Sequence, residues 1–453
     1  MSLEVIILAA GKGTRMRSDL PKVLHPLAGK PMLAHSIEQA ATLKPKQTHI
    51  IVGHGAQQVA TLVEPFGAKC VTQDQQLGTG HAVAQAMPKV DNSAIVLVLY
   101  GDVPLVPGAL MQRLVDKAMH GDLAILTVTL DDASGYGRIV RDDHGHIQAI
   151  VEHKDANLNQ LKIKEINTGI LAAKASLLNG WLPRIGSNNA QGEVYLTDIV
   201  AMAVADGVGI SNLQPDFEQH TQGVNDRVQL AELERWFQQQ QATKLLRDGV
   251  QLADPSRFDL RGELTAGKDI FIDINAIIEG NVSLEDGVHI GPNCHIKDCH
   301  IGTGTKVLAN SVVDQAQVGP GCTIGPFARL RPGTVMHEQA KVGNFVETKK
   351  TTLGKGSKAN HFTYLGDTIV GEQVNIGAGT ITCNYDGVNK FQTIIGDGVF
   401  IGSNSSIVAP VNIGAGSTIG AGSTITKDVA DDHLAVARGK QRNIASWAKP
   451  VKC

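Results

Sequence analysis

The sequence predicts an α/β domain with a mostly parallel sheet, followed by a long helix and then a β-helix of hexapeptide repeats. Three observations support this prediction. Residues 1 to about 225 alternate short aliphatic runs with helical patterns, residues 225–247 have one helical pattern, and from about residue 271 aliphatic residues recur every six positions. The 453 residues give room for two or three domains with real cores.

The first part of the chain has the pattern of an α/β domain. Strands that alternate with helices imply a mostly parallel sheet that is covered on both faces. Such sheets bind ligands beyond the carboxyl ends of their strands. The expected strands are Val5–Leu8, His49–Val52 and Ile95–Leu99, and the expected helices are Met32–Thr42, Gln57–Glu64 and Gly108–Met119.

The middle segment predicts one long connecting helix. Apolar residues between Asn225 and Arg247 have a mainly helical spacing, and either Asn225 or Asp226 can cap its start. We therefore expect a first domain at residues 1–225, a helical linker at 226–249, and a β-helix domain with a C-terminal tail at 250–453.

The last part of the chain has a period of six, which fits neither a helix nor a lone amphipathic strand. It is the spacing of a hexapeptide β-helix, in which three hexads close one triangular coil with their aliphatic residues inward. The aromatic content of 4% agrees with so narrow a core. Flat-sided coils usually trimerise, so a homotrimer is expected. The most regular repeat is Ile395, Ile401, Ile407, Ile413, Ile419 and Ile425.

Composition excludes several classes of function. The formal net charge is −3 and the pI is about 6.6, so no basic field favours nucleic acid or an anionic membrane. The first apolar run is too short for a signal peptide, and no window is long enough to span a membrane. The cysteines form no Cys-x-x-Cys pair, which predicts reduced thiols in a cytoplasmic protein. They lie at positions 70, 294, 299, 322, 383 and 453.

The loop after the first expected strand, Leu8–Met16, has features of a phosphate-binding loop. It matches neither the P-loop nor the dinucleotide fingerprint, because Gly11 and Gly13 have the wrong spacing. Their backbone N–H groups can approach a triphosphate, and we expect a following helix to add its positive end. Nearby cations can hold phosphate, although a solvated basic loop is the alternative. These cations are Lys12, Arg15, Arg17 and Lys22.

Several blocks of the sequence resemble those of sugar-1-phosphate nucleotidyltransferases. The blocks are Leu8–Met16, Pro21–Met32, Gln73, Gln76–Gly80, Tyr100–Pro104, Val151–Lys154 and Glu165–Gly169. Together with the hexapeptide half, they make the chain similar from end to end to one bacterial bifunctional family, the GlmU family. The resemblance implies an α/β nucleotidyltransferase domain, Rossmann-like with a mostly parallel sheet, joined by a long helix to a left-handed parallel β-helix.

The resemblance also implies two successive reactions. Acetyl-CoA would acetylate the amine of glucosamine-1-phosphate, and the resulting N-acetylglucosamine-1-phosphate would attack the α-phosphate of UTP and release pyrophosphate. The product, UDP-N-acetylglucosamine, would feed the synthesis of peptidoglycan and lipopolysaccharide precursors. The implied cofactor is Mg²⁺. The implied partners are these small-molecule substrates and further copies of the chain in a homotrimer, with no nucleic acid and no membrane insertion.

In the first domain, Asp102 follows an expected strand, where a carboxylate is well placed to hold Mg²⁺. The resemblance implies that Asn225 is a second metal ligand, and that Arg15 and Lys22 are catalytic and stabilise phosphate charge. A turn-forming Asp102 and a helix-capping Asn225 are the alternatives. Further implied contacts are Leu8, Ala9, Ala10, Gly11, Tyr100 and Gly101, with Gln73, Gly78 and Thr79 at uracil and Gly137, Glu152 and Asn167 at N-acetylglucosamine.

In the β-helix, the repeat is interrupted by two polar segments, Lys355–Asp367 and Thr382–Thr393. His361 has an outward-facing offset, and a near-neutral imidazole can accept a proton from an attacking amine. An exposed histidine is usually inert, but the resemblance implies that His361 is the general base. It also implies sugar-phosphate contacts at Arg331, Lys349, Tyr364, Asn375 and Lys390, and acetyl-CoA contacts at Ala378, Asn384, Tyr385, Ser403, Ala421 and Arg438. The tail, with Trp447 and Lys449, is expected to fold over the acetyl-CoA cleft.

Two alternative interpretations remain open at this stage. In the first, the β-helix is a trimerisation stalk that carries no site of its own. The polar segment around Asn384 and the segment around His361 both argue against this alternative. The chain can also be a non-catalytic subunit that senses nucleotides, against which Arg15, Lys22 and Asp102 argue.

Overall fold

The computed structural model describes residues 1–452 and divides into two compact units, Met1–Trp236 and a second unit that begins at Phe237. The predicted free thiol at Cys453 lies outside the described residues. The other five cysteines form no disulfide in the part of the chain that the structure describes.

The first unit is built on a mixed, mostly parallel sheet with the strand order β11-β7-β10-β6-β1-β4-β5. Strand β10 is antiparallel to both of its neighbours, β6 and β7, whereas the pairs β1–β4, β1–β6, β4–β5 and β7–β11 are parallel. The strands of this path are β1 (Leu3–Leu8), β4 (Gln47–Val52), β5 (Lys69–Thr72), β6 (Ile95–Tyr100), β7 (Leu123–Thr129), β10 (Glu165–Lys174) and β11 (Ile210–Leu213). Strands β8 (Arg138–Arg141) and β9 (Ile147–Val151) pair beside β10, and β2 (Pro26–Leu27) pairs with β3 (Lys30–Pro31).

Helices cover the sheet and bury one apolar cluster on each of its faces. Because successive residues of a strand point to opposite faces, Ile6 and Leu8 belong to one cluster, and Val5 and Ile7 belong to the other. Helices α3 (Thr79–Ala86), α5 (Ala175–Trp181) and α6 (Asp198–Ala205) contribute to the first cluster. Helices α1 (Met32–Ala41), α2 (Ala56–Val63) and α4 (Gly108–Met119) contribute to the second.

One sequence expectation about the phosphate loop is wrong. Only a three-residue 3₁₀ turn, Thr14–Met16, follows Gly13, so no helix N-terminus stands behind Gly11 and Gly13. Arg17 ends this turn with a left-handed backbone (φ 49°), which breaks the helical path. The positive charge of this loop therefore comes from side chains and single N–H groups, and not from a helix dipole.

The predicted long helix is α7 (Arg227–Arg247). Its cap is Asp226, whose Oδ1 accepts hydrogen bonds from the backbone N–H groups of Val228 and Gln229, both at 2.9 Å. The side chain of Asn225 is therefore free for another task, which settles the choice between the two capping candidates.

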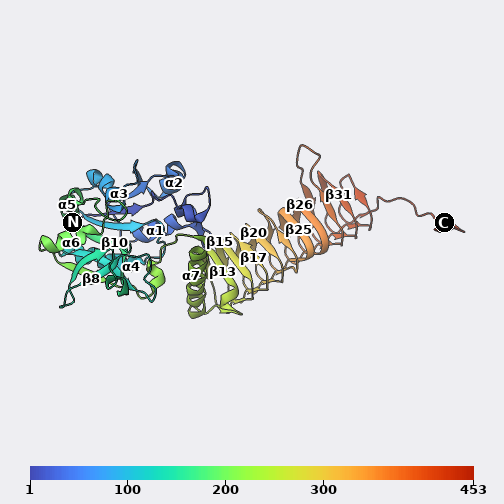
Figure 1. Cartoon of the computed structure of the whole chain (residues 1–453). Helices are drawn as coiled ribbons and strands as arrows, with labels where there is room; N and C mark the ends of the chain where they lie inside the picture. The colour runs from blue at the N-terminus through green and yellow to red at the C-terminus, as the bar shows by residue number, and fades with distance from the viewer. Residues whose placement is uncertain (453) are drawn as a thin grey trace. The chain divides into compact units, whose positions relative to one another are not determined.

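The second unit is a parallel β-helix whose successive coils stack along one axis (Figure 1). The β-helix begins before the regular six-residue repeat. Its first strand, β12 (Gln251–Leu252), already pairs in parallel with β14 (Phe271–Ile272), where the repeat starts. The remaining strands up to the long pair are β13 (Phe258–Ala266), β15 (Ala276–Leu284), β16 (His289–Ile290), β17 (His295–Lys297), β18 (His300–Ile301), β19 (Lys306–Val307), β20 (Val312–Asp314), β21 (Gln317–Val318), β22 (Thr323–Ile324), β23 (Arg329–Leu330) and β24 (Val335–Met336).

Two long strands, β25 (Lys341–Leu353) and β26 (Lys358–Val370), run in parallel register and are followed by shorter strands. Between β28 and β29 a loop projects from the coils, held by a bridge between Tyr385 and Lys390 (Figure 1). These later strands are β27 (Asn375–Ile376), β28 (Ile381–Cys383), β29 (Thr393–Ile395), β30 (Phe400–Ile401), β31 (Ser406–Val408), β32 (Val411–Ile413), β33 (Thr418–Ile419), β34 (Thr424–Ile425) and β35 (Leu434–Ala435).

The repeating aliphatic residues form the core of the β-helix, as their spacing predicts. Ile401 and Ile419 are register partners in successive coils, and both are fully buried. Burying one such side chain contributes about 1.5–3 kcal/mol, so a stack of these residues stabilises each coil against its neighbours. After β35 the tail has no helix or strand up to residue 452, and Trp447 is 70% exposed. The expected closure of the tail over its own chain's cleft is therefore not observed.

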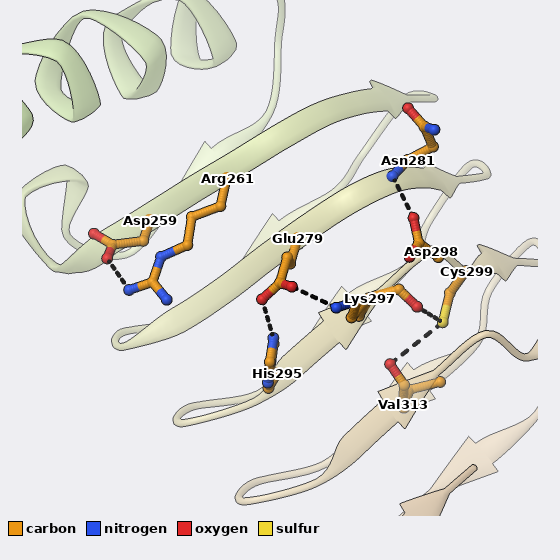
Figure 2. Close-up of polar contacts among 9 residues, drawn as sticks. All are labelled: Asp259, Arg261, Glu279, Asn281, His295, Lys297, Asp298, Cys299 and Val313. Carbon is orange, nitrogen blue, oxygen red and sulfur yellow. Dashed lines mark hydrogen bonds and ion pairs between the residues drawn. The ribbon is translucent and has the colours of Figure 1, made fainter. Parts of the chain in front are cut away.

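Outward-facing residues of the first coils form a row of alternating charge. Arg261 pairs in register with Glu279, and Glu279 with Lys297. Figure 2 shows Glu279 between two partners, Lys297 at 2.6 Å and His295 at 3.1 Å. Asp314 continues the row after Lys297. Each exposed pair contributes little to stability, but like charges directly opposite each other are avoided in this part of the row. No helix in the part of the chain that the structure describes is long and apolar enough to cross a membrane.

Candidate active sites

A cavity of about 280 Å³ lies at the carboxyl ends of β1 and β6, and we call it the nucleotide cavity. This is the edge at which parallel sheets bind ligands. Gly101 follows β6 and packs against Ala9, Val23 and Leu33 at its rim. Residues predicted from the sequence make up most of the lining: Leu8, Ala9, Ala10, Gly11, Lys22, Gln73, Gly78, Thr79, Tyr100 and Asp102.

The polar centre of this cavity joins segments that are far apart in the sequence. The ammonium group of Lys22 contacts the carboxylate of Asp102 directly and lies 3.4 Å from Oδ1 of Asn225. The guanidinium group of Arg15 donates to the same oxygen at 3.0 Å. The structure therefore brings together the four residues that the sequence predicts for phosphate chemistry and metal binding.

The same geometry tests whether these residues fit a divalent cation. Asp102 and Asn225 direct one oxygen each toward a common point, because the ammonium group of Lys22 contacts both. Mg²⁺ usually takes one or two protein oxygens and fills its other positions with water and substrate phosphate. The residues present therefore fit Mg²⁺, although the described residues contain no cluster of three or more His, Cys, Asp or Glu.

Two glycines of this site differ in the space beside their backbone, which is open at one and occupied by neighbouring atoms at the other. A Cβ at Gly11 would meet nothing within 4 Å, so the space beside its Cα in the nucleotide cavity is open. A Cβ at Gly78 would lie 2.6 Å from the carbonyl oxygen of Val194, and Gly78 has φ 116°, which strains any other residue. Gly78 is therefore required for the shape of the loop, whereas the backbone at Gly11 leaves open space at the cavity.

The residues predicted to contact the sugar also lie together. Oε1 of Glu152 is 3.4 Å from the position of a Cβ on Gly137, whose carbonyl oxygen accepts from the backbone N–H of Asn167 at 2.9 Å. Glu152 lines a second cavity, of about 410 Å³. Burial raises the pKa of the Glu152 carboxyl, and three nearby carboxylates raise it further, whereas a hydrogen bond from Thr197 lowers it.

Tyr100 lies within electrostatic range of Asp102, a predicted metal ligand, and of Glu152, a predicted sugar contact. Its ring packs against Gly169, where a Cβ would lie 2.8 Å from the hydroxyl oxygen. Burial raises the pKa of Tyr100 strongly, and the charges of Asp102 and Glu152 raise it further. The hydroxyl group therefore lies within the electrostatic reach of both carboxylates and stays protonated at neutral pH.

In the β-helix, the alternating row of charges ends at a cluster of cations. Arg331 follows Leu330, and Lys349 follows Thr348, the register partner of Leu330, so two cations are adjacent in the row. Lys390, from the projecting loop, lies within hydrogen-bond reach of Lys349 and lowers its pKa, and Arg331 lowers it further. Three cations gathered in this way repel one another, so the cluster favours the binding of an anion.

Beside this cluster, Gly366 provides space for two predicted site residues. Gly366 pairs in register with Lys349, and a Cβ there would lie 2.4 Å from the hydroxyl oxygen of Tyr364 and 2.8 Å from Nδ2 of Asn384. Asn384 also donates to Asp367 at 2.5 Å. The absence of a side chain at Gly366 therefore positions Tyr364 and Asn384 next to the cations.

His361 lies at an exposed corner of the coil, in register with Asn344, and its imidazole has no hydrogen-bond partner among residues 1–452. Lys349 lies one coil earlier and pairs in register with Gly366, beyond His361 on β26, and Asn375 lies on another face, in register with Lys358 and Phe400. Within one chain, the structure therefore does not bring His361 and Asn375 into contact with the cation cluster.

The predicted acetyl-CoA residues form a column of small side chains along the last coils. Ile376, Ile401 and Ile419 are register partners, so Ala378, Ser403 and Ala421 occupy the same place two residues later. Arg438 donates to the carbonyl oxygen of Ala421 at 2.6 Å. Tyr385, in the projecting loop, is 58% exposed. Small residues in successive coils leave room for an extended ligand parallel to the axis.

Comparison with known proteins agrees with both halves. Residues 5–250 match the MobA-like NTP transferase domain, residues 260–352 the GMPPB C-terminal domain, and residues 392–427 the bacterial transferase hexapeptide family with six repeats. The chain is 58% identical to bifunctional protein GlmU of Marinobacter nauticus and 59% identical to that of Cellvibrio japonicus, each over 99% of both chains. It is 57% identical to that of Stutzerimonas stutzeri over 100% of both chains.

The chain belongs to the GlmU family.

Membership of the GlmU family confirms the predicted fold and the two predicted activities. The α/β nucleotidyltransferase fold and the left-handed β-helix of hexapeptide repeats are both present. The chain is a bifunctional enzyme that carries out uridylyl transfer and acetyl transfer, and the two domains that these reactions require are both found. The interpretations as a stalk without a site and as a non-catalytic sensor do not agree with this membership.

Sequence reasoning missed several residues that shape the sites. Gln76 donates to the carbonyl oxygen of Ala10 at 2.5 Å, and Glu193 lines the nucleotide cavity. In the β-helix, Glu347 accepts from Arg331 at 2.8 Å. The hexad offset of Glu347, which places it beside Arg329 of the preceding coil, is the one signal that could have revealed it. The partner of Gln76 depends on loop packing that no sequence period encodes.

Proposed function

We propose that this chain makes UDP-N-acetylglucosamine from glucosamine-1-phosphate, with acetyl transfer on the β-helix and uridylyl transfer in the nucleotide cavity. The observation that carries the first-domain assignment is the convergence of Asp102, Asn225 and Lys22 inside a cavity edged by an open glycine. In such a pathway the product would supply precursors of peptidoglycan and lipopolysaccharide.

In the uridylyl step, the phosphate of N-acetylglucosamine-1-phosphate attacks the α-phosphate of UTP, and the bond to pyrophosphate breaks. Such a transfer depends on positioning and charge neutralisation, and it needs no covalent nucleophile. Arg15 and Lys22 bind the phosphate oxygens and stabilise their charge, and the N–H of Gly11 approaches the same oxygens. Mg²⁺, held by Asp102 and Asn225, supplies further neutralisation when it is bound.

Recognition of uracil and of the sugar falls to the two ends of this site. Gln73, Gly78 and Thr79 line the nucleotide cavity and are placed at uracil in this proposal. Gly137, Glu152 and Asn167 are placed at N-acetylglucosamine. Tyr100 lies between them and keeps its proton, so that its hydroxyl group can donate a hydrogen bond.

In the acetyl step, the amine of glucosamine-1-phosphate attacks the thioester carbonyl of acetyl-CoA. A carbon–nitrogen bond forms, the carbon–sulfur bond breaks, and CoA leaves as its thiol. His361 accepts the proton that the amine loses, and Arg331, Lys349 and Lys390 bind the sugar phosphate. Tyr364 and Asn375 contact the sugar, and the small residues from Ala378 to Ala421 line the cleft for acetyl-CoA.

A homotrimer is part of this proposal. Within one chain, His361 and Asn375 lie on parts of the coil that do not contact the cation cluster, and a neighbouring copy would complete the site. We expect light scattering after gel filtration to give a mass three times the 48.0 kDa of the chain. A monomeric mass at full acetyltransferase activity would contradict the trimer. The free, mostly buried thiols are consistent with the cytoplasm as the compartment.

One reaction mixture tests the whole proposal. Purified protein is supplied with glucosamine-1-phosphate, acetyl-CoA, UTP and Mg²⁺, and the products are followed by mass spectrometry. UDP-N-acetylglucosamine, free CoA and pyrophosphate are expected together, and omission of acetyl-CoA should stop all three. Release of CoA without any nucleotide sugar, or the reverse, would show that one of the two assignments is wrong.

A further inference from the structure

A hydrogen-bonded row of three side chains begins at the wall of the nucleotide cavity, and two of its members have no role in the function proposed above. The row consists of Gln73, His81 and Gln85. Gln73 is 4% exposed, and its Nε2 lies 3.2 Å from the carbonyl oxygen of Gly78 and 3.0 Å from Nδ1 of His81. On the other side of the ring, Nε2 of Gln85 lies 3.1 Å from Nε2 of His81.

The chemistry of these groups determines which atom donates. A backbone carbonyl can only accept, so the Gln73 atom next to Gly78 is its NH₂ group, and Nδ1 of His81 accepts from that same group. A neutral imidazole accepts at one nitrogen only, so Nε2 of His81 carries the proton. Nε2 of Gln85 lies against this nitrogen and also donates to the carbonyl oxygen of His81 at 3.4 Å, so the Gln85 amide accepts the proton of His81 only after it turns about its last bond.

This arrangement gives the remaining Gln73 oxygen a defined direction. Both contacts of the Gln73 side chain use its nitrogen, and no donor among residues 1–452 reaches its Oε1. Gln73 also lines the nucleotide cavity. The cavity therefore presents a buried acceptor, which matches the N3–H donor of uracil. Cytosine has an acceptor at the same ring position, so two lone pairs would face each other.

We propose that His81 is a positioning residue that determines the choice between uracil and cytosine nucleotides, by holding the Gln73 amide with its oxygen toward the base. This inference rests on the proposed function, because it takes the nucleobase to lie against Gln73. His81 acts through Gln73 and contacts no substrate itself. Its ring contacts Gln73 on one side and Gln85 on the other.

The test compares UTP with CTP as the nucleotide for full-length protein, with N-acetylglucosamine-1-phosphate and Mg²⁺ present and pyrophosphate release as the measurement. His81→Leu removes the acceptor for the Gln73 amide, whereas His81→Asn keeps an oxygen near the place of Nδ1. We expect His81→Leu to lower the ratio of kcat/KM for UTP to that for CTP by about 10- to 100-fold, the range for one mispaired buried hydrogen bond. His81→Asn should keep most of the wild-type ratio.

Gln85→Leu provides a second variant at a half-exposed position, which keeps the test open if His81→Leu folds poorly. Loss of the acceptor for Nε2–H allows the imidazole to turn, so the same ratio should fall. An equal loss of kcat/KM for both nucleotides in His81→Leu and in Gln85→Leu would overturn the inference, since it indicates a merely structural role. A wild-type enzyme that releases no pyrophosphate with either nucleotide would instead overturn the proposed function.

Discussion

Asn225 and Asp226 are adjacent residues with similar side chains, yet the structure gives them separate tasks. Asp226 accepts from two backbone N–H groups at the start of α7, whereas Asn225 turns its oxygen toward Arg15 and Lys22. Residue type alone suits both positions equally, because either side chain can cap a helix or bind a metal. The difference arises from which residue the end of the helix directs toward the cavity.

This pair gives a matched prediction. Asp226→Ala should destabilise the protein by about 1 kcal/mol, the usual cost of a lost N-cap, and leave the Mg²⁺ dependence of uridylyl transfer unchanged. Asn225→Ala should have the opposite profile, with unchanged stability, lower activity and a higher Mg²⁺ concentration for half-maximal rate. Denaturant unfolding and Mg²⁺ titrations of pyrophosphate release measure both. Equal effects of the two substitutions on Mg²⁺ dependence would contradict the separation of tasks.

Glu152 carries a second prediction at this scale. Burial raises the pKa of its carboxyl, so its protonated form stabilises the folded state below the ordinary pKa of 4.5, and this stabilisation is lost as the pH rises through the raised value. Glu152→Gln keeps an oxygen for Thr197 and removes the charge. We expect the variant to melt above wild type at pH 8 and the difference to vanish near pH 4, by calorimetry. A difference independent of pH would show that the charge of Glu152 costs the fold nothing.

At the scale of elements, the β-helix separates its core from its site by the direction of each side chain. Inward positions stack aliphatic residues from coil to coil, and outward positions either alternate in charge or gather cations. Function therefore changes the outward positions of only a few coils and leaves the stack intact. Gly366 is one such outward position, and its missing side chain leaves room for Tyr364 and Asn384.

The inward stack yields a prediction about stability. Ile407 is fully buried and pairs with Thr382 and Ile425 in the coils on either side. Ile407→Ala should lower the free energy of unfolding of the β-helix by about 2–5 kcal/mol and leave uridylyl transfer unchanged. Val388→Ala, at a residue that is 84% exposed in the projecting loop, should change stability by less than about 0.5 kcal/mol. Circular dichroism during denaturant unfolding measures both, and equal effects would contradict the assigned core.

At the scale of the whole molecule, each unit has its own compact core and its own set of proposed catalytic residues. Arg15 and His361 lie in different units. A substitution in one unit can then abolish one of the two activities and leave the other intact. Such separate loss distinguishes two independent sites from one composite site.

This independence predicts complementation between inactive variants. His361→Ala should lose acetyl transfer and keep uridylyl transfer, and Arg15→Ala should show the reverse pattern. Neither variant alone should convert glucosamine-1-phosphate to UDP-N-acetylglucosamine, whereas a mixture of the two should do so, because the acetylated intermediate can diffuse between molecules. Mass spectrometry of the product measures this. A mixture that stays inactive although each variant keeps its own half-reaction would show that the intermediate does not leave the molecule.

The sequence by itself determined the two fold classes, because strand–helix alternation and a period of six are local patterns of burial. Through its resemblance to a family, it also determined which residues to expect near phosphate and at the acetyl site. Only the tertiary structure decided that Asn225 meets Arg15 across 210 positions, that a short turn and not a helix follows Gly13, and that Gln73 is held by His81. The physical reason is that a local pattern records whether a side chain is buried, whereas its hydrogen-bond partner depends on how distant segments pack.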